Sequence, residues 1–207
     1  MNKSDIIIIG SGPGGYRTAA YAASKGKTVT IFEEGHLGGT CLNVGCIPTK
    51  TFARSAEAVD EIRNAAQLGL KAVEPQFELA DIVARKDNIV DQLRQAIAAV
   101  LSAPGITLIN KKASFVDDHT VEADGERYTA DNIIIATGSS HKTLRLETLD
   151  ESMLLTSDSL LSLTDFPRRL VIVGAGVIGM EFASIFRQLG AEVTVVELLK
   201  ECIPALD

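Results

Sequence analysis

The chain carries one short pattern twice, and this repeat constrains its fold more than any other feature. Each copy reads as an apolar strand, a glycine-rich turn, a helix, a second strand and a glutamate. In the first copy the strand covers residues 6–9 and the turn residues 10–15; in the second they cover 170–173 and 174–179. Continuous apolar strands followed by helices are typical of parallel sheets that are covered on both faces. The sequence therefore predicts an α/β fold.

The two copies align without a gap. Their equivalent positions are Gly10 and Gly174, Gly12 and Gly176, Gly15 and Gly179, Gly26 and Gly190, and Glu33 and Glu197. In such a unit, backbone N–H groups and the helix dipole bind a pyrophosphate, and the acid binds a ribose hydroxyl. Packing alone does not explain an acid at the same strand end in both copies. We therefore expect two nucleotide sites.

Residues 38–50 follow the first copy and place Cys41 and Cys46 in a frame of glycines. In a regular helix, Cα atoms five residues apart lie roughly 8.6 Å apart, beyond the roughly 7 Å that a disulfide spans. A bond between the two cysteines requires a distorted turn, which Asn43 and Gly45 tolerate. A strained disulfide of this kind is exchangeable. Two free buried thiols are the alternative, whereas a metal site lacks enough ligands; we expect redox chemistry.

This stretch resembles the redox-active motif of the flavin-dependent pyridine-nucleotide disulfide oxidoreductases, and Leu42, Ile47 and Pro48 make it most similar to the dihydrolipoamide dehydrogenases. The resemblance implies FAD at the first site and NAD at the second. It implies a dihydrolipoyl substrate, carried by a 2-oxo acid dehydrogenase or a glycine-cleavage carrier protein, and a homodimeric full-length enzyme. The alternatives are a mercuric or glutathione reductase, or a nucleotide-binding fragment without turnover.

By the same resemblance, Cys41 is the thiol that exchanges with substrate sulfur, and Cys46 lies against the flavin. Lys50 lies beside the reactive flavin nitrogen, and we expect it to pair with Glu181. The positions that match FAD contacts are Gly10, Gly12, Pro13, Gly14, Gly15, Glu33, Gly39, Thr40, Lys50, Ala113, Thr137 and Gly138. Those that match NAD contacts are Gly174, Gly176, Ile178, Gly179, Glu181 and Glu197. No metal ligands are predicted.

Between the two copies, residues 49–68 and 79–101 have helical periodicity and predict a helical hairpin. Residues 106–109 predict a strand. Residues 113–116, 120–123 and 126–129 predict a small antiparallel β meander, and 132–136 a further strand. The expected architecture is two Rossmann-like doubly wound domains: an FAD-binding domain over residues 1–142, which carries the dithiol, and the first half of an NAD-binding domain over 143–207.

Composition narrows the choice of partners. The 207 residues carry a net charge of −7, with a pI near 5.0, which gives no electrostatic reason to bind nucleic acid or an anionic membrane. No apolar run approaches the ~18 residues of a membrane span, and the run at residues 6–9 is too short for a signal peptide. We expect a cytoplasmic protein.

One family feature has no match in this sequence. In the resembling family, a histidine from a C-terminal interface domain acts as the acid–base partner of the exchange thiol. His36, His119 and His141 match no such segment, and we expect all three on the surface. We interpret the chain as the N-terminal part of such an enzyme, unable by itself to turn over dihydrolipoamide with NAD.

Overall fold

The structure is a computed structural model that describes residues 2–142, 150 and 153–203. The chain divides into two compact units. The first comprises Met1–Cys46 and Ile89–Lys142, and the second comprises Ile47–Asn88 and Thr143–Asp207.

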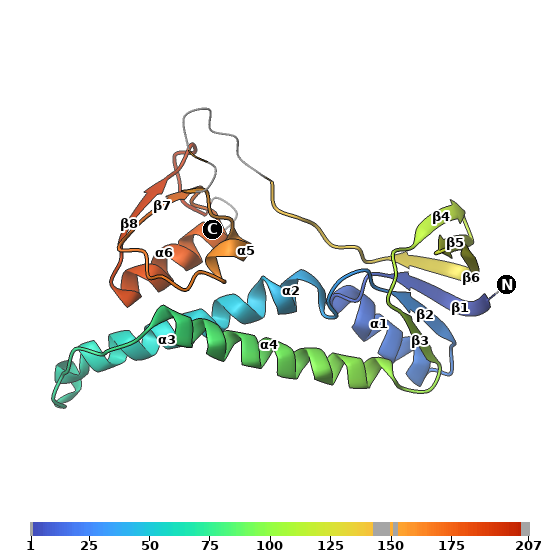
Figure 1. Ribbon diagram of the computed structural model, residues 1–207, viewed down its shortest axis with the longest axis horizontal. Coiled ribbons are helices and arrows are strands. Elements are labelled where there is room, and N and C mark those ends of the chain that lie inside the picture. Colours follow the sequence, from blue (N-terminus) through green and yellow to red (C-terminus); the bar gives the residue numbers. More distant parts are fainter. Residues whose placement is uncertain (1, 143–149, 151–152, 204–207) are drawn as a thin grey trace. The chain divides into compact units, whose positions relative to one another are not determined.

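The first unit is built on a six-stranded sheet with the order β3-β2-β1-β6-β5-β4 (Figure 1). Its strands are β1 (Asn2–Ile9), β2 (Val29–Phe32), β3 (Ile106–Ile109), β4 (Ser114–Asp117), β5 (Thr120–Ala123) and β6 (Glu126–Ile135). β1 pairs in parallel with β2 and β6, and β2 in parallel with β3, whereas β4 and β5 are antiparallel. The parallel part is the nucleotide fold that the first copy of the repeat predicts.

β6 corrects the prediction of two separate strands over residues 126–129 and 132–136. It is a single strand of 10 residues. Its first half pairs with β5 and its length from Tyr128 to Ile135 pairs with β1. Ala130 and Asp131 do not break it, because Ala130 is buried and its N–H donates to the carbonyl of His119. The predicted meander is therefore an extension of the main sheet.

Helix α1 (Pro13–Ser24) packs against β1, β2 and β3. On the sheet, Ile7 and Phe32 are almost fully buried in a cluster that continues into the antiparallel strands through Val121 and Tyr128. The rings of Phe32 and Tyr128 meet edge to face with centroids 5.1 Å apart. This contact joins the parallel and antiparallel parts of the sheet into one core.

The hairpin consists of α3 (Cys46–Arg63), a 3-10 turn η1 (Ala65–Leu68) and α4 (Leu79–Leu101). The second copy of the repeat forms β7 (Arg169–Val173), α6 (Val177–Leu189) and β8 (Glu192–Val196), preceded by the short helix α5 (Ser157–Leu160). β7 and β8 are parallel and form a two-stranded sheet.

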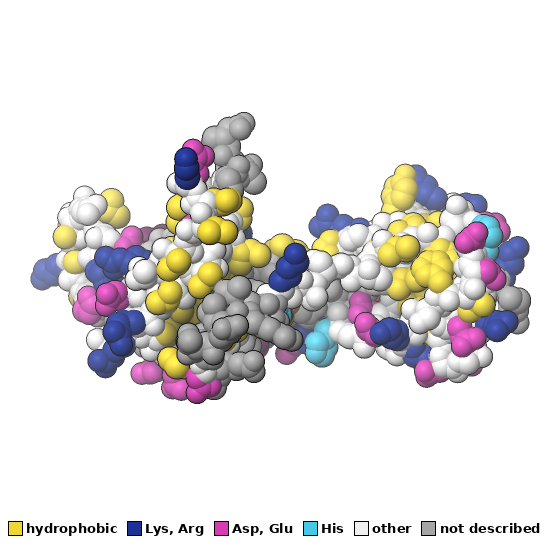
Figure 2. Space-filling view, turned by 90° about the horizontal axis from the view of Figure 1, so that it is seen from above, with side chains coloured by type: hydrophobic (Ala, Val, Ile, Leu, Met, Phe, Trp, Pro, Cys, Tyr) yellow, Lys and Arg dark blue, Asp and Glu magenta, His cyan; other side chains and the backbone are white. Residues whose placement is uncertain are grey.

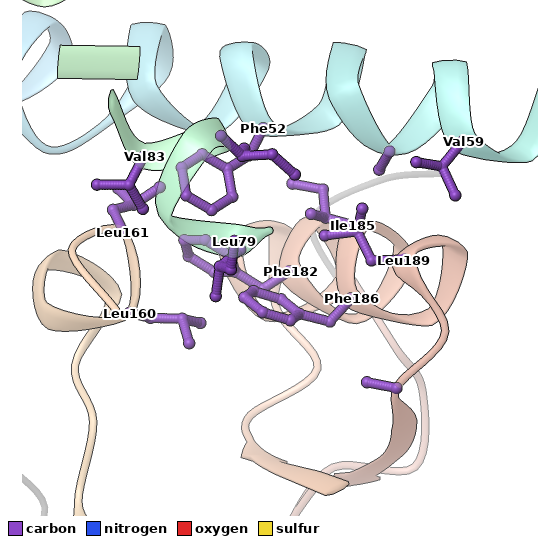
Figure 3. Packing of buried hydrophobic residues seen from close by; sticks show 13 residues of the cluster. Phe52, Val59, Leu79, Val83, Leu160, Leu161, Phe182, Ile185, Phe186 and Leu189 are labelled. Atoms are coloured by element: carbon purple, nitrogen blue, oxygen red, sulfur yellow. The ribbon is translucent and has the colours of Figure 1, made fainter. Parts of the chain in front are cut away.

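The hydrophobic core of the second unit lies where the hairpin meets α6 (Figure 3). Phe52 from α3 and Leu79 from α4 pack with Phe186 of α6, and all three are at most 1% exposed. Leu160 and Leu161 close the cluster. These apolar contacts explain why residues 47–88 group with the second unit, whereas the assignment of residues 1–142 to an FAD-binding domain stays a functional prediction.

The β7–β8 sheet leaves one face uncovered. Val171, Val173 and Val196 are 64%, 59% and 51% exposed, while the alternate positions face α6. Apolar side chains accordingly surface on the second unit, in the left half of the space-filling view (Figure 2). Over the described residues, we find no helix with the length and apolarity of a membrane span.

The buried ring of Phe186 gives a test of this core. Replacing Phe186 with alanine should lower the free energy of unfolding by about 3–5 kcal/mol, because it removes a large apolar group and leaves a cavity. The matched control is Phe115→Ala on β4, where the ring is 50% exposed and the expected loss is below about 1 kcal/mol. Urea denaturation followed by circular dichroism measures both; equal losses would contradict the packing described.

Candidate active site

A cavity of about 740 Å³ opens at the carboxyl ends of β1, β2 and β6 in the first unit. It lies in the ordinary size range of small-molecule sites. Eleven residues that the sequence predicted for the first site or its thiol line it: Gly10, Gly12, Pro13, Gly14, Glu33, Gly39, Thr40, Cys41, Ala113, Thr137 and Gly138. His36, Lys111 and Lys112 line it as well and were not predicted to do so. The structure thus brings the nucleotide motif and one thiol to a single cavity.

The glycine turn is held by backbone contacts that exclude side chains. Gly10 has φ +101°, and a Cβ on it would lie 2.2 Å from the carbonyl oxygen of Ala136. Gly15 does not line the cavity; a Cβ there would lie 1.8 Å from the oxygen of Gly10. α1 begins at Pro13, which has no N–H, and the N–H groups of Gly15 and Tyr16 donate to the carbonyl of Gly12 at 2.8 and 3.0 Å. The N–H of Gly14 and the positive end of the helix dipole are what this helix N-terminus offers to a pyrophosphate.

Glu33 is fixed by three hydrogen bonds. Its carboxylate accepts from the backbone N–H and the hydroxyl of Ser11, at 2.8 and 2.7 Å, and from the N–H of Gly35 at 2.8 Å. The Ser11 hydroxyl, fully buried, also accepts from the N–H of Gly38 at 3.3 Å. Sequence reasoning missed Ser11, although a polar residue in the variable position of the glycine motif is a usable signal.

The cysteine stretch has the distorted turn that the spacing required. α2 (Gly39–Asn43) ends before α3 begins at Cys46. Between them, Gly45 lies so close to α2 that a Cβ would be 2.9 Å from the oxygen of Thr40 and 3.3 Å from the Cα of Cys41. Cys41 and Cys46 are both free thiols in this structure, and Cys46 lies near enough to affect the pKa of Cys41. The disulfide itself stays a prediction.

The surroundings of Cys41, Cys46 among them, shift the ionisation of its thiol. Burial raises the pKa of the Cys41 thiol above its ordinary value, and the hydrogen bond with Cys46 and the charge of its sulfur raise that pKa further. The Arg17 guanidinium, on α1, acts in the opposite direction. The net effect of this environment is to favour the protonated form of Cys41, with one nearby cation that favours its thiolate.

In the second unit, the second glycine turn repeats the first. A Cβ on Gly179 would lie 2.1 Å from the oxygen of Gly174. Glu197 accepts from the N–H groups of Ala175 at 2.6 Å and Leu199 at 2.8 Å. These bonds, that of Leu199 foremost, hold the pKa of the Glu197 carboxyl below its ordinary value. Gly176 lies in the same turn, Ile178 lies in the first turn of α6, and Glu181 is the fifth residue of that helix.

Lys50 of α3 and Glu181 of α6, both in the second unit, form an ion pair. The predicted meeting of these two charges is confirmed. Their side chains are 65% and 34% exposed, so the pair is solvent-accessible and its worth to stability is small. Their roles beside a flavin stay predictions.

The three histidines are exposed, as expected. His119 contacts the carbonyl of Ala130 through Nδ1 at 3.1 Å, and His36 lines the cavity. Within the ranges that the structure describes, no group of three or more histidine, cysteine or acidic side chains is placed to hold a metal ion.

The fold is that of the Rossmann-like nucleotide-binding proteins, with Cys41 in the cavity beside its first glycine turn, and comparisons with known proteins give the family. The family described as pyridine nucleotide-disulphide oxidoreductase matches residues 4–207. The chain belongs to this family, whose members are FAD-dependent oxidoreductases.

The chain is also similar to individual members. It is 38% identical, over its full length, to the dihydrolipoyl dehydrogenase of Acholeplasma laidlawii and to the mitochondrial dihydrolipoyl dehydrogenase of Pisum sativum. It spans 63% and 42% of their lengths, respectively. The solved structure of the HOCl-induced flavoprotein disulfide reductase RclA from Escherichia coli matches with a TM-score of 0.81 and 30% identity, over 98% of this chain and 44% of RclA.

The Arg17 cation gives a test of the thiol environment. We expect Arg17→Ala to raise the pKa of the Cys41 thiol further, because the guanidinium favours the thiolate. The pH dependence of iodoacetamide labelling at Cys41, followed by peptide mass spectrometry, measures this shift. It should shrink in 1 M salt, where the screening length falls to about 3 Å. Arg54→Ala, which removes an exposed arginine of α3, should leave the midpoint unchanged; an unchanged midpoint for Arg17→Ala at low salt would contradict the assignment.

Proposed function

We propose that this chain is the FAD-binding and dithiol-bearing portion of a dihydrolipoyl dehydrogenase, which oxidises dihydrolipoyl groups and passes the electrons to NAD. The observation that carries the proposal is that Cys41, with Cys46 beside it, lines the same cavity as the first glycine turn and Glu33. The relatives that bear this name support the choice of substrate.

The residues present fit FAD. The N-terminus of α1, with its helix dipole and the N–H of Gly14, suits the pyrophosphate, and Glu33 suits a ribose hydroxyl. Gly12 leaves room there, since only the Cα of Gly39, at 3.7 Å, lies near the position of a Cβ. Cys41 and Thr40 in the same cavity put a thiol within the space that the group would occupy. When bound, the flavin of FAD supplies a carrier for two electrons between a dithiol and a nicotinamide.

The protein's own step is thiol–disulfide exchange. Starting from a Cys41–Cys46 disulfide, one dihydrolipoyl thiolate bonds to the sulfur of Cys41, the S–S bond breaks, and the electron pair passes to the sulfur of Cys46. The second dihydrolipoyl sulfur then displaces Cys41 and closes the lipoyl disulfide. Two electrons and two protons have moved from the substrate to the two cysteines.

The local structure favours Cys41 as the thiol that exchanges with the substrate and Cys46 as the sulfur that receives the electron pair. Cys46 opens the 18-residue helix α3, and a helix N-terminus stabilises negative charge on a neighbouring group. Burial and the neighbouring Cys46 raise the pKa of the Cys41 thiol, which favours its protonated form. We further propose NAD at the second site, because the Glu197 carboxylate accepts from a ribose 2′-hydroxyl and repels a 2′-phosphate.

The test follows this half-reaction without requiring turnover. After mild oxidation in air, peptide mapping should show Cys41 bonded to Cys46, with Cys202 unpaired. Equimolar dihydrolipoamide should open this bond faster than glutathione does, since its second thiol closes a ring. Cys202→Ser should behave like the unchanged protein, and Cys41→Ser should form no link between positions 41 and 46. A Cys41–Cys202 link, or no link at all, would refute the redox assignment.

FAD binding is tested by two glycines with opposite expected behaviour. Gly12→Ala should raise the dissociation constant for added FAD at least tenfold, because the new methyl group occupies the phosphate cradle, while it costs no more than about 1 kcal/mol in folding. Gly26 lies outside the cavity with φ +78° and open space around it. Gly26→Ala should cost about 1–2 kcal/mol in folding and leave FAD affinity unchanged. Flavin fluorescence and urea denaturation measure the two quantities; equal FAD affinities would count against the first site.

A further inference from the structure

The side chain of Asn43, the last residue of α2, links the helix to the loop before it and to α4. Its amide nitrogen donates to the carbonyls of Leu37 at 3.0 Å and Gly39 at 2.9 Å. Its oxygen accepts from Arg94 through Nε at 3.0 Å and Nη2 at 2.7 Å. Both hydrogens and both acceptor positions of the amide are therefore used.

Arg94 is itself held in place. Its remaining terminal nitrogen, Nη1, donates to Asp91 at 2.7 Å on the same face of α4. The Arg94 side chain is 30% exposed, so its bonds to Asn43 are only partly open to water. Bonds in which one partner is charged are roughly twice as strong as neutral ones. The Arg94 guanidinium therefore binds the C-terminal end of α2 to α4.

Asn43 lies between the two cysteines along the chain. Asn43 ends α2, two residues after Cys41 and three before Cys46, and the chain turns directly after it. The same side chain fixes the loop before α2 through Leu37 and Gly39. Any displacement of Asn43 moves the backbone that sets the separation of the two sulfurs.

We propose that Arg94 and Asn43 are positioning residues that set the dithiol–disulfide equilibrium of Cys41 and Cys46; the inference rests on the proposed function. We do not assign either side chain a direct contact with the reacting sulfurs. The clasp, meaning Asn43, Arg94 and Asp91 with their hydrogen bonds, keeps the turn bent and so keeps the effective concentration of one thiol at the other high. Loosening the clasp lowers that concentration and disfavours the disulfide.

The equilibrium is measured on the full 207-residue chain with glutathione as the redox buffer. The two cysteine thiols give two electrons to the S–S bond of one glutathione disulfide; an S–S bond forms between Cys41 and Cys46, and two glutathione thiols take the two protons. After equilibration, acid quenching and alkylation, peptide mass spectrometry gives the fraction of protein in the disulfide form.

Arg94→Ala should lower the equilibrium constant for disulfide formation about tenfold, the size expected for one bond to a charged group, which corresponds to about 30 mV in potential. Arg94→Lys keeps the charge but not the two-nitrogen fork, and should fall between, about threefold below the unchanged protein. The matched control is Arg85→Ala. Arg85 is also on α4, but it donates to the carbonyl of Thr51 and the hydroxyl of Ser55, beyond Cys46 along α3.

The outcomes separate this inference from the proposed function. If the Arg94 variants keep the equilibrium constant of the unchanged protein, or if Arg85→Ala lowers that constant as much as Arg94→Ala does, the clasp inference is overturned. The proposed redox role of Cys41 and Cys46 is unaffected by either result. If Arg94→Ala does not fold, as judged by circular dichroism, Arg94→Lys decides: a constant equal to that of the unchanged protein overturns the inference. If the unchanged chain forms no Cys41–Cys46 bond in any glutathione mixture, the proposed function fails and the clasp inference falls with it.

Discussion

The close approach of two glycine backbones is the contact on which the candidate site depends. Gly39 adopts φ +60°, and a Cβ on it would lie 2.7 Å from the Cα of Gly12. No side chain fits at this point, so the start of α2 rests directly on the turn that opens α1. The N–H of Gly38 adds bonds to the carbonyl and the hydroxyl of Ser11. The nucleotide turn and the dithiol segment are therefore held in direct backbone contact, and the position of one fixes the position of the other.

The second copy of the repeat has the same backbone contacts but a different surrounding. Ser11 gives Glu33 a hydroxyl as well as an N–H, whereas Ala175 gives Glu197 only its N–H. Among the described residues, no atom lies within 4 Å of a Cβ built on Gly176, in contrast to its equivalent in the first copy, Gly12, which meets Gly39. The same local sequence pattern thus produces a first turn that contacts the dithiol segment and a second turn without such a contact in the described part of the chain.

Sequence alone predicted what is encoded locally. Glycine spacing and apolar runs predicted the strands and helices, because turn conformation and strand burial depend on neighbouring residues. The family resemblance placed eleven residues that line one cavity. It did not find Arg94, since its partner Asn43 is 51 residues away. The available signal was a charge within the apolar stripe of α4. The continuity of β6 was also missed, because only its two neighbouring strands decide whether Ala130 and Asp131 interrupt it.

β6 is also a strand in which the sheet tolerates little change in length. Tyr128 and Thr129 pair with Val121 and Thr120 of β5 on one edge and with Asn2 and Lys3 of β1 on the other. A single inserted residue reverses which face every following side chain occupies, and here it would do so against two registers at once. Insertions and deletions that the Asp124–Gly125 turn tolerates should therefore disrupt folding a few residues later, within β6. The register of this strand aligns the antiparallel part of the sheet with its parallel part.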